Sequence, residues 1–184
     1  MPTLQLYFAT SNTHKVRETE NYLGLEIKSA PLELTEPQTL DMEELARHKA
    51  LEAWDKLGRP VMVEDTALVF HGWKGLPGPF IRFFIENMGL EGLYKALEGF
   101  PDKSAEAICT IGYHDGHRVS CFHGHVKGHI CPPRGEQGFG WDPIFVPEGS
   151  ELSFAEMSLD QKQRFSMRAQ ALEKFSQHLD LLGG

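Results

Sequence analysis

Residues 4–15, Leu4-Gln5-Leu6-Tyr7-Phe8-Ala9-Thr10-Ser11-Asn12-Thr13-His14-Lys15, decide the fold class of this chain. The apolar and aromatic run at residues 4–9 predicts a short buried strand. A polar turn at residues 10–12 follows directly, and a helical pattern then continues to a C-terminal stop at Gly24. The order strand, polar turn and helix is typical of an α/β fold.

The alternation of strands and helices continues along the chain. Residues 25–30 predict a second strand, and Asp41 has capping-box spacing at the start of a helix that Gly58 ends. Val61-Met62-Val63 predicts a buried strand that ends at Glu64-Asp65. The remaining predicted elements are a turn at 75–79, a helical stretch at 80–98 broken near Gly89, strands at 105–114 and 117–126 around Asp115-Gly116 with a further strand through Ile130, a strand at 144–146, capping boxes at Ser153 and Ser158, and a helix from about 165 to 182.

Length and composition predict one bilobed domain over residues 1–184, because 184 residues with 41% hydrophobic content form one core of ordinary size. A formal net charge of −8 argues against a protein that grips polynucleotide phosphates nonspecifically. No stretch approaches the roughly 20 apolar residues of a membrane helix, and Met1-Pro2-Thr3 does not begin a signal peptide. We therefore expect a cytoplasmic protein with no nucleic-acid or membrane partner.

The three cysteines, Cys109, Cys121 and Cys131, include no C-x-x-C pair. Their odd number disfavours a disulfide framework and a structural zinc site, so we expect buried small hydrophobes. His123 and His125, with His129 further on, could share a strand face and suggest a metal site, but no matching third ligand stands at convincing spacing. Packed or solvent-facing histidines are the favoured interpretation.

The polar turn after the first strand is a candidate phosphate site. Thr10, Ser11 and Asn12 offer hydroxyl and amide groups beside the free N–H groups of a helix start, and Lys15 adds a positive charge in the first turn. The alternative is that Asn12 or Thr13 only caps the helix. From this motif alone the cap is favoured, because such residues are common before helices.

Glu64 and Asp65, followed by Thr66, form a second candidate site at the expected end of an apolar strand. Ionised carboxylates beside apolar residues are costly unless they are paired, solvated or bound to a cation. Mg²⁺ takes one or two carboxylates together with substrate phosphates and water. An ordinary exposed turn is the alternative, and this motif does not decide between them.

The loop Gly138-Phe139-Gly140-Trp141-Asp142-Pro143 is a candidate base-binding site. Aromatic faces stack on nucleobases, and glycines allow close approach. A carboxylate at Asp142, together with a cation at Lys162 or Arg168, would favour a 6-oxo purine, which presents an N1–H donor and an O6 acceptor. A structural loop with core aromatics is the alternative.

These motifs, taken together and in order, closely resemble the inosine triphosphate pyrophosphatases, the HAM1-like hydrolases of non-canonical purine nucleotides. The resemblance spans nearly the whole chain. It is carried by Thr10-Ser11-Asn12-x-x-Lys15, Ala46-Arg47-His48-Lys49-Ala50, Val63-Glu64-Asp65-Thr66, Gly75-Leu76-Pro77-Gly78-Pro79, Gly138-Phe139-Gly140-Trp141-Asp142-Pro143, Phe154-Ala155-Glu156-Met157, Lys162 and Ser166-x-Arg168.

The resemblance implies an α/β fold of the ITPase/Maf-like kind, with an elongated mixed β-sheet flanked by helices, two lobes around a central nucleotide cleft, and a homodimer. It implies hydrolysis of ITP, dITP and XTP to the monophosphate and pyrophosphate, which removes these nucleotides from the pool. The cofactor it implies is Mg²⁺, with Mn²⁺ as an alternative.

Residue roles follow from the same resemblance. Asp65 and Lys15 are the implied catalytic residues, and Glu36 and Asp65 the implied metal ligands. The implied substrate-binding residues are Thr10, Ser11, Asn12, Lys15, Lys49, Thr66, Arg82, Phe139, Gly140, Trp141, Asp142, Lys162, Met167 and Arg168. We expect Mg²⁺, Lys15 and Lys49 to offset the triphosphate charge while Asp65 orients or deprotonates the attacking water.

One residue departs from the family pattern. The family motif reads Ser-His-Arg where this chain reads Ser166-Met167-Arg168. Because Met167 cannot donate a hydrogen bond, we expect phosphate chemistry to survive and base selectivity to be altered or relaxed. Two other functions fit the pattern less well: a nucleotide sensor without hydrolysis, which the intact Glu64-Asp65 and Lys15 argue against, and a pyrophosphatase for modified pyrimidines.

Overall fold

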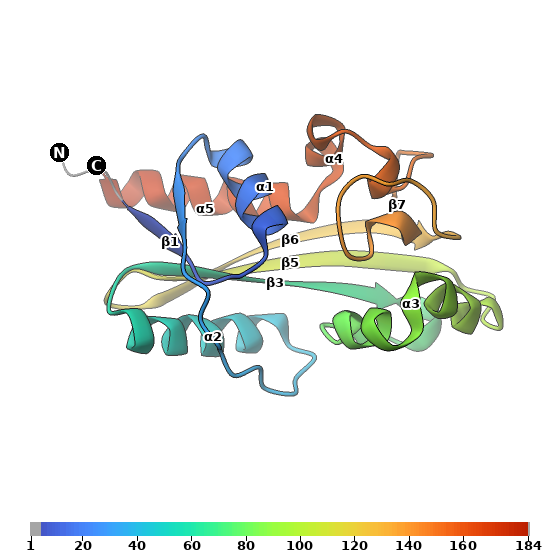
Figure 1. Cartoon of the computed structure of the whole chain (residues 1–184), viewed down its shortest axis with the longest axis horizontal. Helices are drawn as coiled ribbons and strands as arrows, with labels where there is room; N and C mark the ends of the chain where they lie inside the picture. The colour runs from blue at the N-terminus through green and yellow to red at the C-terminus, as the bar shows by residue number, and fades with distance from the viewer. Residues whose placement is uncertain (1–4, 184) are drawn as a thin grey trace. The chain divides into compact units, whose positions relative to one another are not determined.

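The computed structural model describes residues 5–183 (Figure 1). The predicted first strand therefore begins outside the described residues at Leu4, and the prediction about Met1-Pro2-Thr3 falls outside them too. The described part of the chain contains a seven-stranded mixed sheet and five α-helices. The predicted mixed sheet flanked by helices is thus confirmed. None of the helices within residues 5–183 is long and apolar enough to cross a bilayer.

The strand order is β2-β1-β3-β5-β6-β7, and β4 pairs with β3 off this path. The elements are β1 (Leu6–Phe8), α1 (Thr13–Leu23), β2 (Ile27–Ser29), α2 (Met42–Leu57), β3 (Val61–Phe70), β4 (Pro77–Gly78), α3 (Ile81–Glu98), β5 (Ser104–His114), β6 (Val119–Ile130), β7 (Phe145–Pro147), α4 (Leu159–Phe165) and α5 (Met167–Gly183), with short 3₁₀ turns at His71–Trp73, Asp142–Ile144 and Phe154–Glu156.

The chain divides into two compact units. The first unit comprises residues 1–65, 110–123 and 170–184, and the second comprises residues 66–109 and 124–169. Strands β3, β5 and β6 contribute residues to both. The expectation of a single bilobed domain over residues 1–184 stays a prediction.

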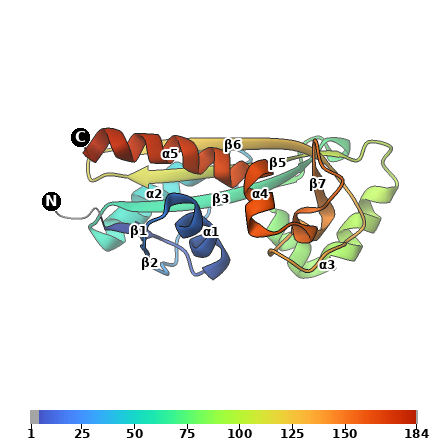
Figure 2. The ribbon, with the colours of Figure 1, turned by 90° about the horizontal axis from the view of Figure 1, so that it is seen from above.

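In the first unit, β1 pairs in parallel with β2 on one side and β3 on the other. Helix α2 buries Ala50 and Ala53 against Val61 and Val63 of β3. Figures 1 and 2 show α2 on one face of these strands and α1 and α5 on the other. Both faces are covered, which is consistent with the nearly continuous apolar runs of β1 and of residues 61–63 in β3.

The face opposite α2 is held by aromatic side chains. Tyr113 of β5 lies with its ring centroid 5.1 Å from that of Phe175 in α5, and Phe122 of β6 lies 5.5 Å from the same ring. The preceding residue, Gly112, faces α2, because a Cβ built there would lie 2.8 Å from the carbonyl oxygen of Ala46. Because side chains alternate along β5, Tyr113 faces α5 and its neighbour Gly112 faces α2.

The second unit has its own aromatic core. The rings of Phe145 and Phe154 lie 5.2 Å apart between centroids, and Trp141 packs edge-on against Phe145 at 5.7 Å. Strand β7 pairs antiparallel with β6, placing Phe145 opposite Ile130. Helix α3 is interrupted at Gly89, as predicted, where φ is 69° and ψ is 169°.

Several helix termini follow the sequence signals. Asn12 and Asp41 cap α1 and α2, and each side chain accepts hydrogen bonds from two backbone N–H groups of the first turn. Both helices end at the predicted glycines, Gly24 and Gly58. Ser153 and Ser158 both form complete capping boxes.

Four boundaries predicted from sequence were wrong. Strand β2 covers only residues 27–29, the turn at 75–79 contains β4, and the two strands expected between residues 117 and 130 are the single strand β6. The helix expected from about residue 165 begins at Met167 instead, directly after Ser166, whose backbone is extended and whose Oγ accepts from the N–H groups of Arg168 and Ala169. A hydroxyl that caps a new helix competes with continuation of the old one.

Candidate functional site

The turn between β1 and α1 is organised by its own side chains. Asn12 Oδ1 accepts from the backbone N–H of His14 at 3.0 Å and of Lys15 at 3.3 Å, while Thr10 Oγ1 accepts from the N–H of Asn12 at 3.1 Å. Asn12 is therefore a helix cap, and its role in phosphate binding stays a prediction. Ser11 is exposed in the same turn. This arrangement presents hydroxyls and an amide at a helix N-terminus, where anions are stabilised.

Lys15 reaches from the first turn of α1 to Glu64 of β3. Its Nζ donates to the carbonyl oxygen of Glu64 at 3.1 Å and lies 3.2 Å from the Oε1 atom of the same residue. Thr19 Oγ1 donates to the Lys15 carbonyl oxygen one turn later. The side chain of Glu64 is fully buried. A buried carboxylate is costly without a charged partner, and Lys15 supplies that partner.

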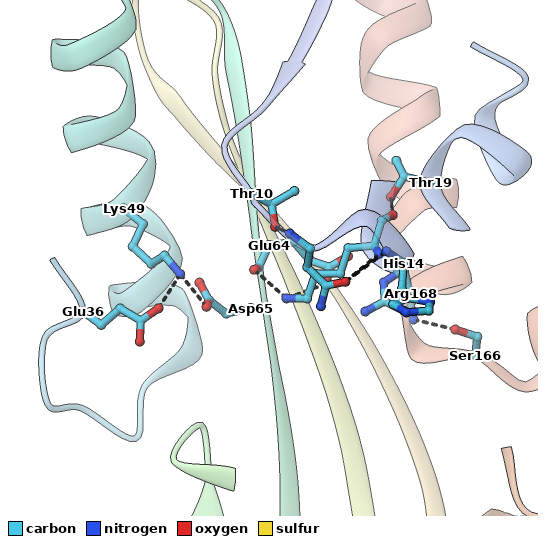
Figure 3. A network of polar contacts seen from close by, with 11 residues as sticks. Thr10, His14, Thr19, Glu36, Lys49, Glu64, Asp65, Ser166 and Arg168 are labelled. Atoms are coloured by element: carbon cyan, nitrogen blue, oxygen red, sulfur yellow. Dashed lines mark hydrogen bonds and ion pairs between the residues drawn. The ribbon is translucent and has the colours of Figure 1, made fainter. Parts of the chain in front are cut away.

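Lys49 of α2 binds two further carboxylates (Figure 3). Its Nζ donates to Asp65 Oδ1 at 2.7 Å and to Glu36 Oε1 at 2.9 Å. Glu36 lies in the connection between β2 and α2, so the group draws on three separate parts of the first unit. The Lys49 and Asp65 side chains are largely buried, and that of Glu36 is more exposed.

Burial works to lower the pKa of the Lys49 ammonium, but the Asp65 and Glu36 carboxylates outweigh it, so the pKa is raised above the usual value for lysine. Lys49 is therefore charged at neutral pH. A raised pKa in the folded state contributes stability that is complete below the unfolded value of about 10.4 and is lost as the pH rises through the folded value.

The sequence pattern predicted that Glu64 and Asp65 end a strand, and this prediction is wrong. Both residues lie inside β3, which continues to Phe70. The continuation Thr66–Phe70 pairs with β4, which no local sequence signal announced. It is β1 that ends here, since its last ladder pair is Phe8 with Met62. Glu64 and Asp65 thus lie just beyond the carboxyl end of β1, the position at which open α/β sheets bind ligands.

Adjacent residues of a strand point to opposite faces, and the ion pairs follow this rule. Glu64 is bound by Lys15 of α1, and Asp65 is bound by Lys49 of α2. These two helices cover opposite faces of the strands (Figures 1 and 2). The two lysine–carboxylate groups described above, Lys15 with Glu64 and Lys49 with Asp65 and Glu36, are therefore joined by the peptide bond between residues 64 and 65.

The donor set of Asp65 and Glu36 fits a hard divalent cation. Asp65 Oδ2 is buried and has no hydrogen-bond partner, whereas Oδ1 is bound to Lys49. A buried carboxylate oxygen without a partner is uncommon. Within residues 5–183, no three His, Cys, Asp or Glu side chains are grouped as a complete metal cage. Such a sparse set of oxygen ligands suits Mg²⁺, which relies on substrate phosphates and water for its remaining ligands.

The second unit contains a buried ion pair in the loop after β6. Lys162 Nζ donates to Asp142 Oδ2 at 2.7 Å, and the two residues are 3% and 4% exposed. The same oxygen accepts from the backbone N–H of Phe139 at 2.8 Å. Asp142 therefore closes the loop across residues 139–142 and anchors it to α4.

Phe139 lies beside two cations. The Lys162 ammonium is 5.0 Å from the centroid of its ring, and the Arg168 guanidinium carbon is 5.3 Å from it. Phe139 is half-buried, while Arg168 is only 2% exposed. We call the four residues Phe139, Asp142, Lys162 and Arg168 the aromatic–cation cluster. Its composition suits a planar ring that carries oxygen acceptors.

Trp141 takes a different place from the other loop aromatic. It is 6% exposed and packs against Phe145 and Phe154. Trp141 is thus packed in the core, Phe139 presents more surface, and the base-binding role of both stays a prediction. Met167 is also buried, directly after the break at Ser166.

The remaining candidates lie apart from these contacts. Arg82, on α3, has a side chain 64% exposed, pairs with Glu86 one turn away at 3.5 Å and lies over the ring of Phe83. Thr66 is half-buried in β3, and Gly140 is exposed. The prediction for each of these residues remains untested.

Sequence reasoning gave Glu64 and Gly138 no individual role, since Glu64 was named only beside Asp65 and Gly138 only as part of the aromatic loop. Glu64 could have been inferred from strand alternation, since Glu64 and Asp65 cannot share one face. Gly138 has a φ of 73°, and a Cβ built on it would lie 2.0 Å from Asp142 Oδ2. Only glycine leaves room for the carboxylate that closes the loop.

The histidines and cysteines have structural partners. His123 Nδ1 lies 3.0 Å from Thr110 Oγ1, and His125 Nδ1 lies 2.8 Å from Glu106 Oε1. None of the three cysteines is in a disulfide, and Cys121 is half-buried rather than buried as expected. Burial raises the pKa of Cys121 and Cys131 above the usual value, so these thiols are protonated at neutral pH and are poor nucleophiles.

Comparison with known proteins matches residues 6–178 to the Ham1 family. The chain belongs to this family. It is 44% identical to an inosine triphosphate pyrophosphatase of Aspergillus fumigatus over 98% of this chain and 97% of that protein. It is 39% identical to a dITP/XTP pyrophosphatase of Methanopyrus kandleri over 95% of each.

A solved structure of a HAM1 protein from Coxiella burnetii superimposes with a TM-score of 0.84 and 30% sequence identity, covering 97% of this chain and 99% of that one. The match extends over the residues of both units. The fold implied by the sequence motifs is therefore that of this family.

Proposed function

We propose that this chain is a nucleoside triphosphate pyrophosphatase that hydrolyses ITP, dITP and XTP to the monophosphate and pyrophosphate, removing these nucleotides from the pool. The observation that carries the proposal is its similarity, over nearly the full length of both chains, to relatives named for these activities. The two lysine–carboxylate groups and the aromatic–cation cluster supply suitable chemistry.

The triphosphate is assigned to residues of the first unit. Thr10, Ser11 and Asn12 lie at the N-terminus of α1, where backbone N–H groups and the helix dipole favour anions. Lys15 and Lys49 contribute the two positive charges of this unit's ion-pair groups. Charge stabilisation of this kind is the main protein contribution to phosphoryl chemistry.

Asp65 is assigned the role of orienting or deprotonating the attacking water. Its Oδ2 atom has no partner in the structure, while Oδ1 is held by Lys49, so the carboxylate is fixed with one oxygen available for further bonding. Mg²⁺, or Mn²⁺ in its place, would be held by Glu36 and Asp65 and would neutralise phosphate charge when bound.

The purine is assigned to the aromatic–cation cluster of the second unit. The partly exposed ring of Phe139 offers a stacking surface, and the Asp142 carboxylate is assigned as an acceptor for the N1–H of the purine. The cations Lys162 and Arg168 match the O6 acceptor of hypoxanthine and xanthine. In this assignment Trp141 and Met167 act through packing.

Identification of the first phosphate product tests the proposal. The purified chain is incubated with ITP and Mg²⁺, and pyrophosphate and orthophosphate are measured separately over the first turnovers. We expect inosine monophosphate and pyrophosphate in equal amounts. Orthophosphate as the primary product would identify a phosphatase instead, and no release of either would leave a nucleotide-binding protein without hydrolytic activity.

Two properties of the whole protein belong to the same proposal. We propose a homodimer, on the strength of family membership. We also propose that the protein acts in the cytoplasm, where cysteines outside disulfides, such as the three here, are usual.

A further inference from the structure

The ammonium of Lys49 is held between the two carboxylates that the proposed function assigns to a divalent cation. Lys49 Nζ lies 2.7 Å from Asp65 Oδ1 and 2.9 Å from Glu36 Oε1. The lysine side chain is 10% exposed and that of Asp65 is 14% exposed, so solvent screens this contact weakly. Lys49 therefore binds both carboxylates in this structure and offsets one of their two negative charges.

A divalent cation on the same carboxylates would meet this ammonium at short range. Charges at such distances repel strongly in a poorly solvated site. The two cations also need some of the same oxygen lone pairs, since each carboxylate already accepts a hydrogen bond from Lys49 at one oxygen. Binding of Lys49 and binding of the divalent cation to these carboxylates therefore oppose each other, unless the Lys49 ammonium binds another anion.

We propose that Lys49 competes with the divalent cation for Glu36 and Asp65 and gives up these carboxylates to the triphosphate when nucleotide binds. The inference rests on the proposed function, because it needs a polyphosphate to accept the lysine. Asp65 Oδ2, which is buried and has no partner, is an oxygen of this site that Lys49 does not occupy.

The consequence is a positive coupling between nucleotide and metal. A triphosphate that binds the Lys49 ammonium removes the competitor from Glu36 and Asp65, and this raises the affinity of the carboxylates for the metal. By linkage, the metal raises the affinity for nucleotide by the same factor. Lys15 has a different arrangement, since it binds Glu64 on the opposite side of β3.

Mn²⁺ binding to the nucleotide-free protein tests the competition directly. The free Mn²⁺ concentration is followed by electron paramagnetic resonance at pH 8 for the wild type, Lys49→Met and Lys56→Met. Lys56 is a matched control, because it lies on the same helix and pairs with Glu52 at 2.7 Å outside the group. We expect Lys49→Met to bind Mn²⁺ about tenfold more tightly or better, and Lys56→Met to stay within about twofold of the wild type.

Equal or weaker Mn²⁺ binding by a folded Lys49→Met protein would overturn the proposal, as would an equal gain in Lys56→Met. Circular dichroism establishes that each variant is folded. A second measurement needs no substitution: brief acetylation of the wild type, read by mass spectrometry, should modify Lys49 several-fold faster when Mg²⁺ is present, relative to Lys56. An unchanged ratio also counts against the competition.

These outcomes are separable from the proposed function. If the wild type releases pyrophosphate from ITP but Lys49→Met does not bind Mn²⁺ more tightly, the competition is wrong and the enzyme assignment stands. If no pyrophosphate is released, the enzyme assignment fails whatever the Mn²⁺ titration gives.

Discussion

At the scale of single residues, two adjacent carboxylates of β3 have different physical situations. Glu64 has a fully buried side chain and an ion pair with Lys15, whereas Asp65 has one oxygen on Lys49 and one without a partner. Burial with a full set of partners is typical of a positioning group. A carboxylate with an unused oxygen is typical of a reactive one, which favours Asp65 for catalysis.

Asp65→Asn should remove most of the pyrophosphatase activity and leave the fold intact. The amide keeps the side-chain shape but lacks the negative charge needed to deprotonate water or bind a metal, and loss of a general base typically costs about 10²–10⁴-fold in rate. Pyrophosphate release from ITP under saturating Mg²⁺ measures the effect, with circular dichroism as the control. Turnover near that of the wild type would exclude Asp65 from the catalytic role.

Lys162→Met should destabilise the protein far more than Lys56→Met. Lys162 is 3% exposed and its removal leaves the Asp142 carboxylate buried without this ion pair, which typically costs about 3–5 kcal/mol. The Lys56 pair is exposed, and such pairs contribute little. Urea unfolding measures both free energies. Similar values for the two variants would show that the Asp142 contact contributes no more than a surface ion pair.

Met167→His should change the preference among purine triphosphates more than it changes the rate with ITP. Met167 is buried beside Ser166 and Arg168 in the chain, and an imidazole there restores a hydrogen-bonding group that the thioether lacks. The ratios of kcat/KM for ITP, XTP and GTP measure discrimination. Identical ratios in the two proteins would mean that Met167 has no part in base selection.

At the scale of elements, the loop from Gly138 to Pro143 depends on one hydrogen-bonded closure. Asp142 Oδ2 accepts from both Phe139 N–H and Lys162, which fixes the Phe139 ring beside α4. Two glycines in the loop, Gly138 and Gly140, have φ values of 73° and 61°. The positive φ favours glycine at both positions, but only Gly138 also lies against the Asp142 carboxylate.

Gly138→Ala should therefore be more harmful than Gly140→Ala. A Cβ at residue 138 would lie 2.0 Å from Asp142 Oδ2, whereas one at residue 140 meets nothing within 4 Å. The left-handed conformation alone costs about 1–2 kcal/mol in either variant. We expect Gly138→Ala to lose more unfolding free energy in urea and to raise the KM for ITP. Equal losses would show that backbone strain, rather than the clash with Asp142, determines both.

The elements themselves were predictable where the signal was local. The caps at Asn12 and Asp41, the stop at Gly58 and the break at Gly89 each depend on a few neighbouring residues. The predicted element boundaries were wrong where pairing with a residue distant in the sequence determines how far a strand extends. Residues 66–70 extend β3 because β4 pairs with them, and no property of Glu64-Asp65 announces that pairing.

At the scale of the whole molecule, the net charge of −8 coexists with local cations suited to a small anion. Lys15 and Lys49 belong to one unit, and Lys162 and Arg168 to the other. All four are held near carboxylates or aromatic rings rather than spread over a basic surface. Such a distribution suits a nucleotide better than a polynucleotide backbone.

The proposed homodimer should appear as a species of about twice the 20.7 kDa of one chain. Closed two-fold assemblies are the commonest oligomers, and family membership favours one here. Sedimentation velocity at micromolar concentration measures the mass, and a dilution series gives the dissociation constant. A single species of one-chain mass across the series would contradict the dimer.

The sequence by itself determined the fold class and the identity of the candidate residues, because strand and helix periodicity, caps and ordered motifs are properties of short segments. Tertiary structure alone decided which charges meet: Lys49 with Glu36 and Asp65, Lys15 with Glu64, and Lys162 with Asp142. It also decided that Trp141 is packed in the core while Phe139 stays partly exposed. Burial and ion pairing depend on residues far apart in the chain, so no local pattern can specify them.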